Sequence, residues 1–134
     1  MSVIVTDQGF APDDWASEIV PLAALAGQDA VELAHTDDPA GLAGRFGGLA
    51  LIRVTFPSFG DGRGFTVGRR LRELGYTGRL RAAGPLLADQ YAMARRVGFD
   101  EVEIPDDLAE RQPAEQWLFR SDWRSHDYQS RLRG

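Results

Sequence analysis

The stretch LALIRVTF, residues 49–56, decides the class of the fold. Its residues are almost all apolar or β-branched, which is typical of a strand that is covered on both faces. Two glycines precede it, and a loop with three further glycines follows it. Because strands covered on both faces occur mainly in parallel sheets, this stretch predicts an α/β protein.

The segments around it alternate between strand and helix patterns. This alternation predicts βαβ units, and therefore a single α/β domain over residues 1–134 with a mainly parallel sheet of four to five strands. An open sheet and a partial barrel both fit the pattern. The other expected strands are 3–6, 30–35, 79–83 and 101–104. The expected helices are 14–25, 38–46 (with Asp38 as N-cap and Pro39 at the first position), 65–74, 86–97, and two pieces after Pro105 that are separated by Pro113.

Composition excludes several classes of protein. The 134 residues are 43% hydrophobic and 26% charged, as in one ordinary globular domain. No apolar run is as long as a membrane span and the N-terminus lacks the features of a signal peptide, so we expect no membrane association and a cytoplasmic protein. The chain has no cysteine, which excludes an iron–sulfur cluster held by its own thiolates. Its two histidines are far apart in sequence, and no metal site is predicted.

Charge is distributed unevenly along the chain. The net charge is −5, and all 15 basic residues are arginines. Residues 53–99 contain nine of these arginines and only three acids, whereas the segments before and after them are acidic. This basic middle third favours a small anion or an acidic protein partner, while the acidic chain as a whole argues against nucleic-acid binding.

The loop FPSFGDGRGFT, residues 56–66, is the first candidate site. We expect Gly60, Gly62 and Gly64 to adopt positive φ angles, so that backbone N–H groups converge near the start of a helix, which favours anions. Arg63 adds a planar, permanently charged donor for an oxyanion. Asp61 is a candidate base or a partner that orients Arg63.

The segment RAAGPLLADQ, residues 81–90, is the second candidate site. In parallel α/β proteins ligands bind at the carboxyl ends of the strands, so both loops are expected at one edge, with Arg63 within reach of residues 84–90. Arg81 and Gln90 are candidate anion ligands, and Asp89 is a candidate base. The alternative is that the glycines only form turns and the acids only cap helices. His35 follows a predicted strand and is placed on the same edge.

A resemblance adds to this interpretation. Residues 56–104, FPSFGDGRGFTVGRRLRELGYTGRLRAAGPLLADQYAMARRVGFDEVEI, resemble the bacterial domain-of-unknown-function family nine-three-four. The matching motifs are the glycine loop, the LRELGYTGRLRAAG run, Asp89-Gln90 and Gly98-Phe99-Asp100. Members of this family are labelled as oxidoreductases of sulfite reduction and are typically encoded beside sulfite reductase. The resemblance therefore implies a role in sulfate assimilation, but no demonstrated reaction.

The leading hypothesis is an accessory protein of assimilatory sulfite reduction. It would bind sulfite reductase, its electron donor or a sulfur oxyanion through the arginine-rich middle third. The first alternative is an enzyme for a small anion, in which Arg63 and the loop amides hold the anion and Asp61 or Asp89 acts as base. The second is a non-catalytic docking module. A redox role would need a bound flavin or nicotinamide, for which the sequence shows no strong motif, and the sequence leaves the oligomeric state open.

Overall fold

The computed structural model describes residues 2–119, and these residues form one open, seven-stranded sheet with helices. The expected α/β class and mainly parallel sheet are confirmed, although the sheet has two more strands than the upper expected number. Across the sheet the order is β2-β1-β7-β6-β5-β4-β3. The strands are β1 Ser2–Thr6, β2 Gly9–Ala11, β3 Val20–Pro21, β4 Ala30–Ala34, β5 Leu51–Thr55, β6 Arg79–Ala83 and β7 Glu101–Pro105.

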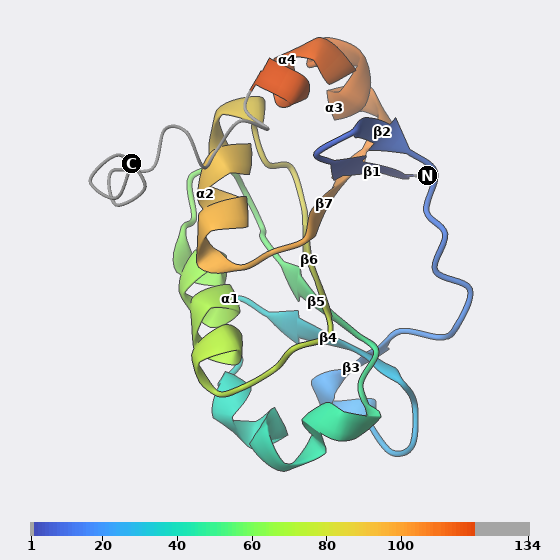
Figure 1. Ribbon diagram of the computed structural model, residues 1–134, viewed down its shortest axis with the longest axis vertical. Coiled ribbons are helices and arrows are strands. Elements are labelled where there is room, and N and C mark those ends of the chain that lie inside the picture. The colour runs from blue at the N-terminus through green and yellow to red at the C-terminus, as the bar shows by residue number, and fades with distance from the viewer. Residues whose placement is uncertain (1, 120–134) are drawn as a thin grey trace, which may run out of the picture.

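The strands β3 to β7 are parallel and lie side by side in chain order, whereas β1 pairs antiparallel with β7 and with β2. Because right-handed crossovers then always advance in the same direction, they bring the connecting helices to one face of the sheet. Figure 1 shows α1 and α2 together on that face. The helical elements are η1 Leu22–Ala24, η2 Pro39–Gly48, α1 Arg63–Glu73, η3 Ala88–Gln90, α2 Tyr91–Val97, α3 Asp106–Arg111 and α4 Ala114–Phe119.

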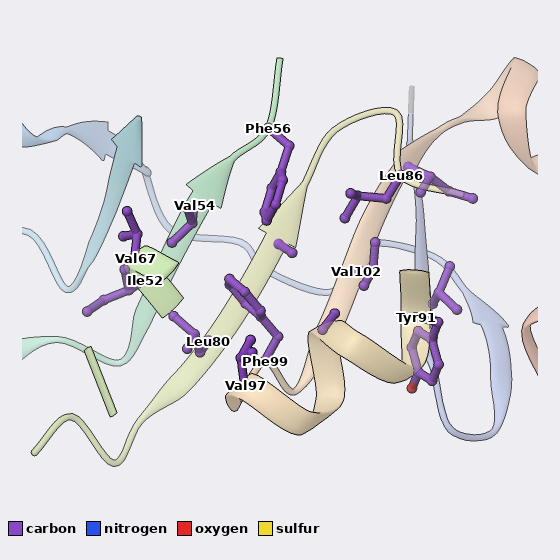
Figure 2. Packing of buried hydrophobic residues seen from close by; sticks show 14 of the residues in the cluster. Ile52, Val54, Phe56, Val67, Leu80, Leu86, Tyr91, Val97, Phe99 and Val102 are labelled. Atoms are coloured by element: carbon purple, nitrogen blue, oxygen red, sulfur yellow. The ribbon is translucent and has the colours of Figure 1, made fainter. Parts of the chain in front are cut away.

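The hydrophobic core lies between the sheet and these helices. Alternate strand residues such as Ile52, Val54 and Leu80 point toward the helices and are completely buried. Phe56 and Phe99 fill the space between β5 and the helices, with ring centroids 6.1 Å apart (Figure 2). Since each fully buried side chain of this size contributes about 1.5–3 kcal/mol, this single layer of contacts stabilises the domain.

The opposite face of the sheet has no helix layer among the described residues. The segment 12–19 between β2 and β3 runs along this side of the molecule (Figure 1). The expectation that β5 is covered on both faces by packed apolar structure is therefore wrong for the second face. There Arg53 pairs with Glu32 on β4 and with Glu103 on β7.

The expected helix over 14–25 is wrong. Residues 14–19 have no regular structure, and the rest of the range forms β3 and the short η1. The cause is a pair of long-range ion pairs, Asp13 with Arg81 and Asp14 with Arg79, which hold the segment across the sheet. These contacts hold residues 13 and 14 against β6 in place of the expected helix.

The other helices follow the prediction with shifted ends. The Asp38 side chain accepts a hydrogen bond from the Ala40 amide and Pro39 is the first helical residue, but η2 is a 3-10 helix. The helix α1 begins two residues earlier than expected, and the expected helix over 86–97 is divided into η3 and α2. Pro113 separates α3 from α4 as predicted. No helix within residues 2–119 has the length and apolar character needed to cross a bilayer.

Candidate functional site

The loops after β4, β5 and β6 lie together at the carboxyl edge of the sheet. The two glycine-containing loops are in direct contact, because Gln90 Nε2 donates a hydrogen bond of 2.7 Å to the Phe59 carbonyl. Gln90 Oε1 also accepts a hydrogen bond of 2.9 Å from the Leu87 amide within its own loop. The predicted meeting of the two loops at one edge is therefore what the structure shows, and the Gln90 amide joins them.

Asp61 and Arg63 form a closed pair at the start of α1. Arg63 Nε donates to Asp61 Oδ1 at 3.0 Å and Arg63 Nη2 donates to Oδ2 at 2.7 Å. The Arg63 amide also donates to Asp61 Oδ1, at 3.1 Å. The Arg63 side chain, followed by this backbone hydrogen bond, holds the pKa of the Asp61 carboxyl well below its usual range. Asp61 is consequently a weak proton acceptor, which argues against its predicted role as a base.

His35, at the end of β4, lies beside this pair. Its Nε2 atom is 3.6 Å from Asp61 Oδ2, and its side chain is 18% exposed. The imidazole therefore faces a carboxylate that stays ionised, and this carboxylate can orient the histidine ring.

A pocket of about 290 Å³ opens between the β4 loop and α1. Arg70 Nη1 lies 3.8 Å from Asp38 Oδ1 at this pocket, and the Asp37 carboxylate is occupied by the Ala34 amide at 2.8 Å. Two acids at this pocket, Asp37 and Asp38, therefore accept hydrogen bonds from nearby backbone amides, since Asp38 caps η2. We call this cavity the β4–α1 pocket; it is lined by His35, Asp37, Asp38, Pro39, Arg63, Thr66, Val67 and Arg70.

The loop glycines do not have the predicted conformation. Gly60, Gly62 and Gly64 are not among the positive-φ glycines of the described chain. Gly64 is required for a different reason, because a Cβ atom at this position would lie 2.5 to 2.7 Å from three atoms of the Phe56 ring. The positive φ occurs in the second loop, at Gly84, where a Cβ would lie 2.3 Å from the Phe56 carbonyl oxygen. These two glycines let both loops approach Phe56 closely.

Arg63 and Asp89 line different cavities. Arg63 lines the β4–α1 pocket and donates its described hydrogen bonds to Asp61, so the contact with residues 84–90 is made by Gln90 rather than Arg63. Asp89 is exposed and lines a cavity with residues of α4 and η3. The two predicted acids are therefore at one edge of the sheet but not in one pocket.

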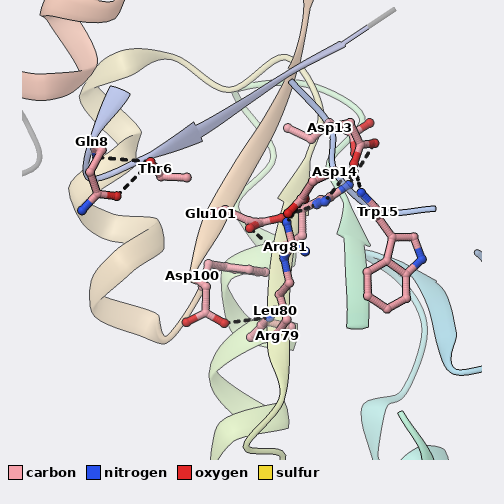
Figure 3. Close-up of polar contacts among 12 residues, drawn as sticks. Thr6, Gln8, Asp13, Asp14, Trp15, Arg79, Leu80, Arg81, Asp100 and Glu101 are labelled. Carbon is pink, nitrogen blue, oxygen red and sulfur yellow. Dashed lines mark hydrogen bonds and ion pairs between the residues drawn. The ribbon is translucent and has the colours of Figure 1, made fainter. Parts of the chain in front are cut away.

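Arg81 lies away from the loops, within β6, and is fully buried. Its Nε donates to Glu101 at 2.6 Å, its Nη1 to Glu103 at 2.9 Å and its Nη2 to Asp13 at 3.2 Å (Figure 3 shows the contacts with Glu101 and Asp13). Burial opposes the charge of Arg81, but the carboxylates of Glu101 and Asp13 outweigh it and raise the pKa of the guanidinium. The predicted anion ligand is thus saturated by the protein's own carboxylates.

The basic middle third shows the same internal pairing. Within residues 2–119 at least seven of its nine arginines form ion pairs, mostly with acids from the flanking parts of the chain. The charge asymmetry of the sequence therefore reflects contacts within the fold more than an open basic surface. The paired residues are Arg53, Arg63, Arg70, Arg72, Arg79, Arg81 and Arg95.

Sequence reasoning missed Thr66 and Arg70 of the β4–α1 pocket. A signal for both exists, because residues 63, 66 and 70 follow the spacing of one helix face. Within residues 2–119 no group of three or more histidine, aspartate or glutamate side chains is arranged to hold a metal ion.

Comparison with known proteins adds one assignment. The family model described as "Bacterial protein of unknown function (DUF934)" matches residues 30–134, which include the β4–α1 pocket and both loops. No curated protein matches the chain.

Proposed function

This chain belongs to the bacterial family of unknown function DUF934, and we propose that it is an accessory protein of sulfite reduction that binds a small sulfur oxyanion in the β4–α1 pocket. The observation that carries the binding proposal is the convergence of Arg63, Arg70 and His35 on one small cavity at the N-terminus of α1. The link to sulfite reduction comes from the family resemblance of residues 56–104.

Electrostatics favour an anion at this position. Arg63 and Arg70 remain half exposed or more in spite of their ion pairs, with 63% and 49% of their side chains accessible. The start of α1, an eleven-residue helix, adds the positive end of its dipole. A pyramidal or tetrahedral oxyanion can accept hydrogen bonds from two guanidinium groups and from the Thr66 hydroxyl at once. The pocket of about 290 Å³ suits a small ligand rather than a dinucleotide.

An accessory role fits the composition better than an electron carrier does. The chain contains no cysteine, so it cannot hold an iron–sulfur cluster by thiolates. Electrons for sulfite would have to come from a bound flavin or nicotinamide, for which the sequence shows no strong motif, or from another protein. The part left to this chain is to bind the oxyanion or to present it to the reductase.

Calorimetric titration tests the binding proposal. Sulfite should bind the full chain, and Arg63→Ala and Arg70→Ala should each weaken binding by about tenfold, the effect of losing a charge-assisted contact. Arg69→Ala is the matched control, because Arg69 is exposed on the same helix and does not line the pocket. Sulfate and phosphate titrations measure selectivity. Failure of all three anions to bind, or equal binding by the Arg63 and Arg69 variants, refutes the proposal.

The pathway part needs its own assay. Sulfide production by purified sulfite reductase and its electron donor should increase when the chain is added, and Arg63→Ala should remove the increase. An unchanged rate at saturating chain concentration refutes the role in sulfite reduction, even if sulfite binds.

A second candidate is an enzyme that transfers a proton to or from a bound anionic metabolite. The 3.6 Å approach of His35 Nε2 to Asp61 favours it, because an ionised carboxylate can orient an imidazole for proton exchange. His35→Gln separates the two candidates. In an oxyanion-binding accessory protein this variant weakens sulfite binding together with the effect on sulfide production, whereas an enzyme keeps binding its substrate but loses turnover.

A further inference from the structure

An apolar groove lies at the same edge of the sheet, beside the β4–α1 pocket but separate from it. It consists of two adjoining cavities, of about 310 Å³ and 570 Å³, which share Leu87 and Gln112. Phe59, from the glycine loop, is 56% exposed on one side of the groove, and Phe119, from α4, is 70% exposed on the other. We call this surface the Phe59 groove; its other apolar residues are Pro85, Leu87, Ala88 and Leu108.

Hydrogen bonds from two glutamine side chains fix the walls of this groove. Gln90 joins the Phe59 carbonyl to the Leu87 amide, as described above. Gln112 Oε1 accepts a hydrogen bond of 2.7 Å from the Ala88 amide, and the Gln112 carbonyl accepts one of 2.9 Å from Trp117 Nε1. Because Trp117 is buried against Tyr91, α4 is anchored to α2. The groove is thus pre-formed, which lowers the entropic cost of binding.

The helices that form one wall are strongly acidic. Residues 106–119 contain four carboxylates and a single guanidinium, that of Arg111, which is 3.4 Å from Asp107. Asp106 and Glu110 are exposed on α3 and do not line the groove. The carboxylates that line it are Glu115 of α4 and Asp89 of η3. Arg111, the one lining cation, is neutralised by Asp107, so the charge that the groove presents is that of Asp89 and Glu115. An apolar groove with two such carboxylates is complementary to a segment that has apolar side chains flanked by lysine or arginine.

We propose that the Phe59 groove is a docking site for an apolar-basic segment of a partner protein. The partner's apolar side chains occupy the space among Phe59, Leu87 and Leu108, and its cations meet the carboxylates of Glu115 and Asp89. This is the reverse of the charge pattern expected from the arginine-rich middle third, whose cations are largely paired within the fold. The proposal does not depend on the oxyanion, because the groove and the β4–α1 pocket share no lining residue.

Fluorescence anisotropy with two labelled helical peptides tests it. In the first peptide a stripe of leucines is flanked by lysines, and in the second the lysines are replaced by glutamates. The lysine peptide should bind the full chain, more weakly at high salt, and the glutamate peptide should not. Failure of the lysine peptide to bind, or equal binding of both peptides, overturns the proposal.

Four variants locate the peptide. Phe59→Ser should weaken binding at least about tenfold, the effect of losing a central aromatic anchor, and Glu115→Gln about twofold to threefold. Met93→Ser is the apolar control, since Met93 is 46% exposed on α2 outside the groove, and Glu73→Gln is the acidic control on α1. Equal losses in Phe59→Ser and Met93→Ser would place the peptide elsewhere and overturn the assignment.

Two further measurements keep the outcomes distinct. Sedimentation of the chain alone shows whether the groove is covered by a second copy: a dimer that Phe59→Ser dissociates overturns the partner proposal in favour of self-association. Glu115→Gln should retain wild-type sulfite affinity. If the chain binds peptide but no sulfite, only the proposed function fails; if it binds sulfite but no peptide, only the groove proposal fails.

Discussion

The close approach of α1 to Phe56 can be tested by adding one methyl group. Gly64→Ala would place a Cβ atom 2.5 to 2.7 Å from three atoms of the Phe56 ring, far inside normal contact distance. The ring cannot easily move, because its centroid is 4.9 Å from that of Phe65 and 6.1 Å from that of Phe99. Phe56 is also only 3% exposed. The helix must therefore shift away from β5, or the core must repack.

Two opposing effects set the size of the loss. Overpacking a well-filled core costs about 1–3 kcal/mol. Alanine improves helix propensity over glycine by up to about 1 kcal/mol, and by less in the first turn where residue 64 lies. The net decrease in the free energy of unfolding should be about 1–2 kcal/mol. For a domain of this size that lowers the melting temperature by roughly 4–8 °C.

Urea and thermal unfolding followed by circular dichroism measure this loss. Gly62→Ala is the control in the same loop, because Gly62 has φ −87° and its added Cβ would be 3.9 Å from the nearest Phe65 atom. That variant should stay within about 0.5 kcal/mol of wild type. Combining Gly64→Ala with Phe56→Leu should recover part of the loss as a coupling energy of about 1 kcal/mol. A Gly64→Ala protein as stable as wild type, with no coupling to Phe56, would refute the described contact.

Two other predictions concern the charged groups. Arg81→Met should lower the free energy of unfolding by about 3–5 kcal/mol, because it removes the guanidinium that pairs with the buried carboxylates of Glu101 and Glu103. Arg53→Met should lower it clearly less, because the Arg53 side chain is 22% exposed. Equal losses in urea titrations would contradict this ranking. Asp61→Asn should destabilise the protein at pH 7 but not in strong acid: the folded-state pKa of Asp61 is depressed by Arg63, so its stabilisation is present above about pH 4 and is lost as the pH falls through the lower folded value. Unfolding curves at pH 7 and pH 2 check this: the deficit should be clearly smaller at pH 2, and a deficit that is equally large at both pH values would mean that the aspartate acts through its shape rather than its charge.

Much of the sheet could be predicted because its signal is local. The strands β4 to β7 each combine a short apolar or alternating run with a turn before and after it, and the helices end at Gly75 and Gly98 with positive φ angles. The helix predicted over 14–25 failed for a non-local reason. Asp13 and Arg81 are 68 positions apart, and no pattern near residue 13 indicates that this contact will override helix formation.

In the candidate site, too, the local features could be predicted from the sequence and the long-range contacts could not. The sequence locates the two loops at one edge, because parallel strands place their carboxyl ends together. It does not show which side chains share a cavity. Arg63 faces the β4 loop and His35, whereas Gln90 makes the contact between the loops. The direction in which a long side chain leaves a loop depends on the neighbouring backbone, which the sequence does not specify.

The charge pattern of the sequence also indicates how the second face of the sheet is stabilised. Register pairs Glu32 with Arg53, Arg53 with Arg81, and Arg81 with Glu101, so these side chains form one row across four parallel strands. Charged residues also recur at every second position of β6, at 79 and 81, and of β7, at 101 and 103. A two-residue period of charge that is positive on β6 and negative on its neighbour β7 indicates a sheet face held by ion pairs instead of a second helix layer. On that argument the basic middle third is complementary to the acidic ends of its own chain, which is why the proposed partner site is the apolar groove beside α3 and α4 and not the arginine-rich segment.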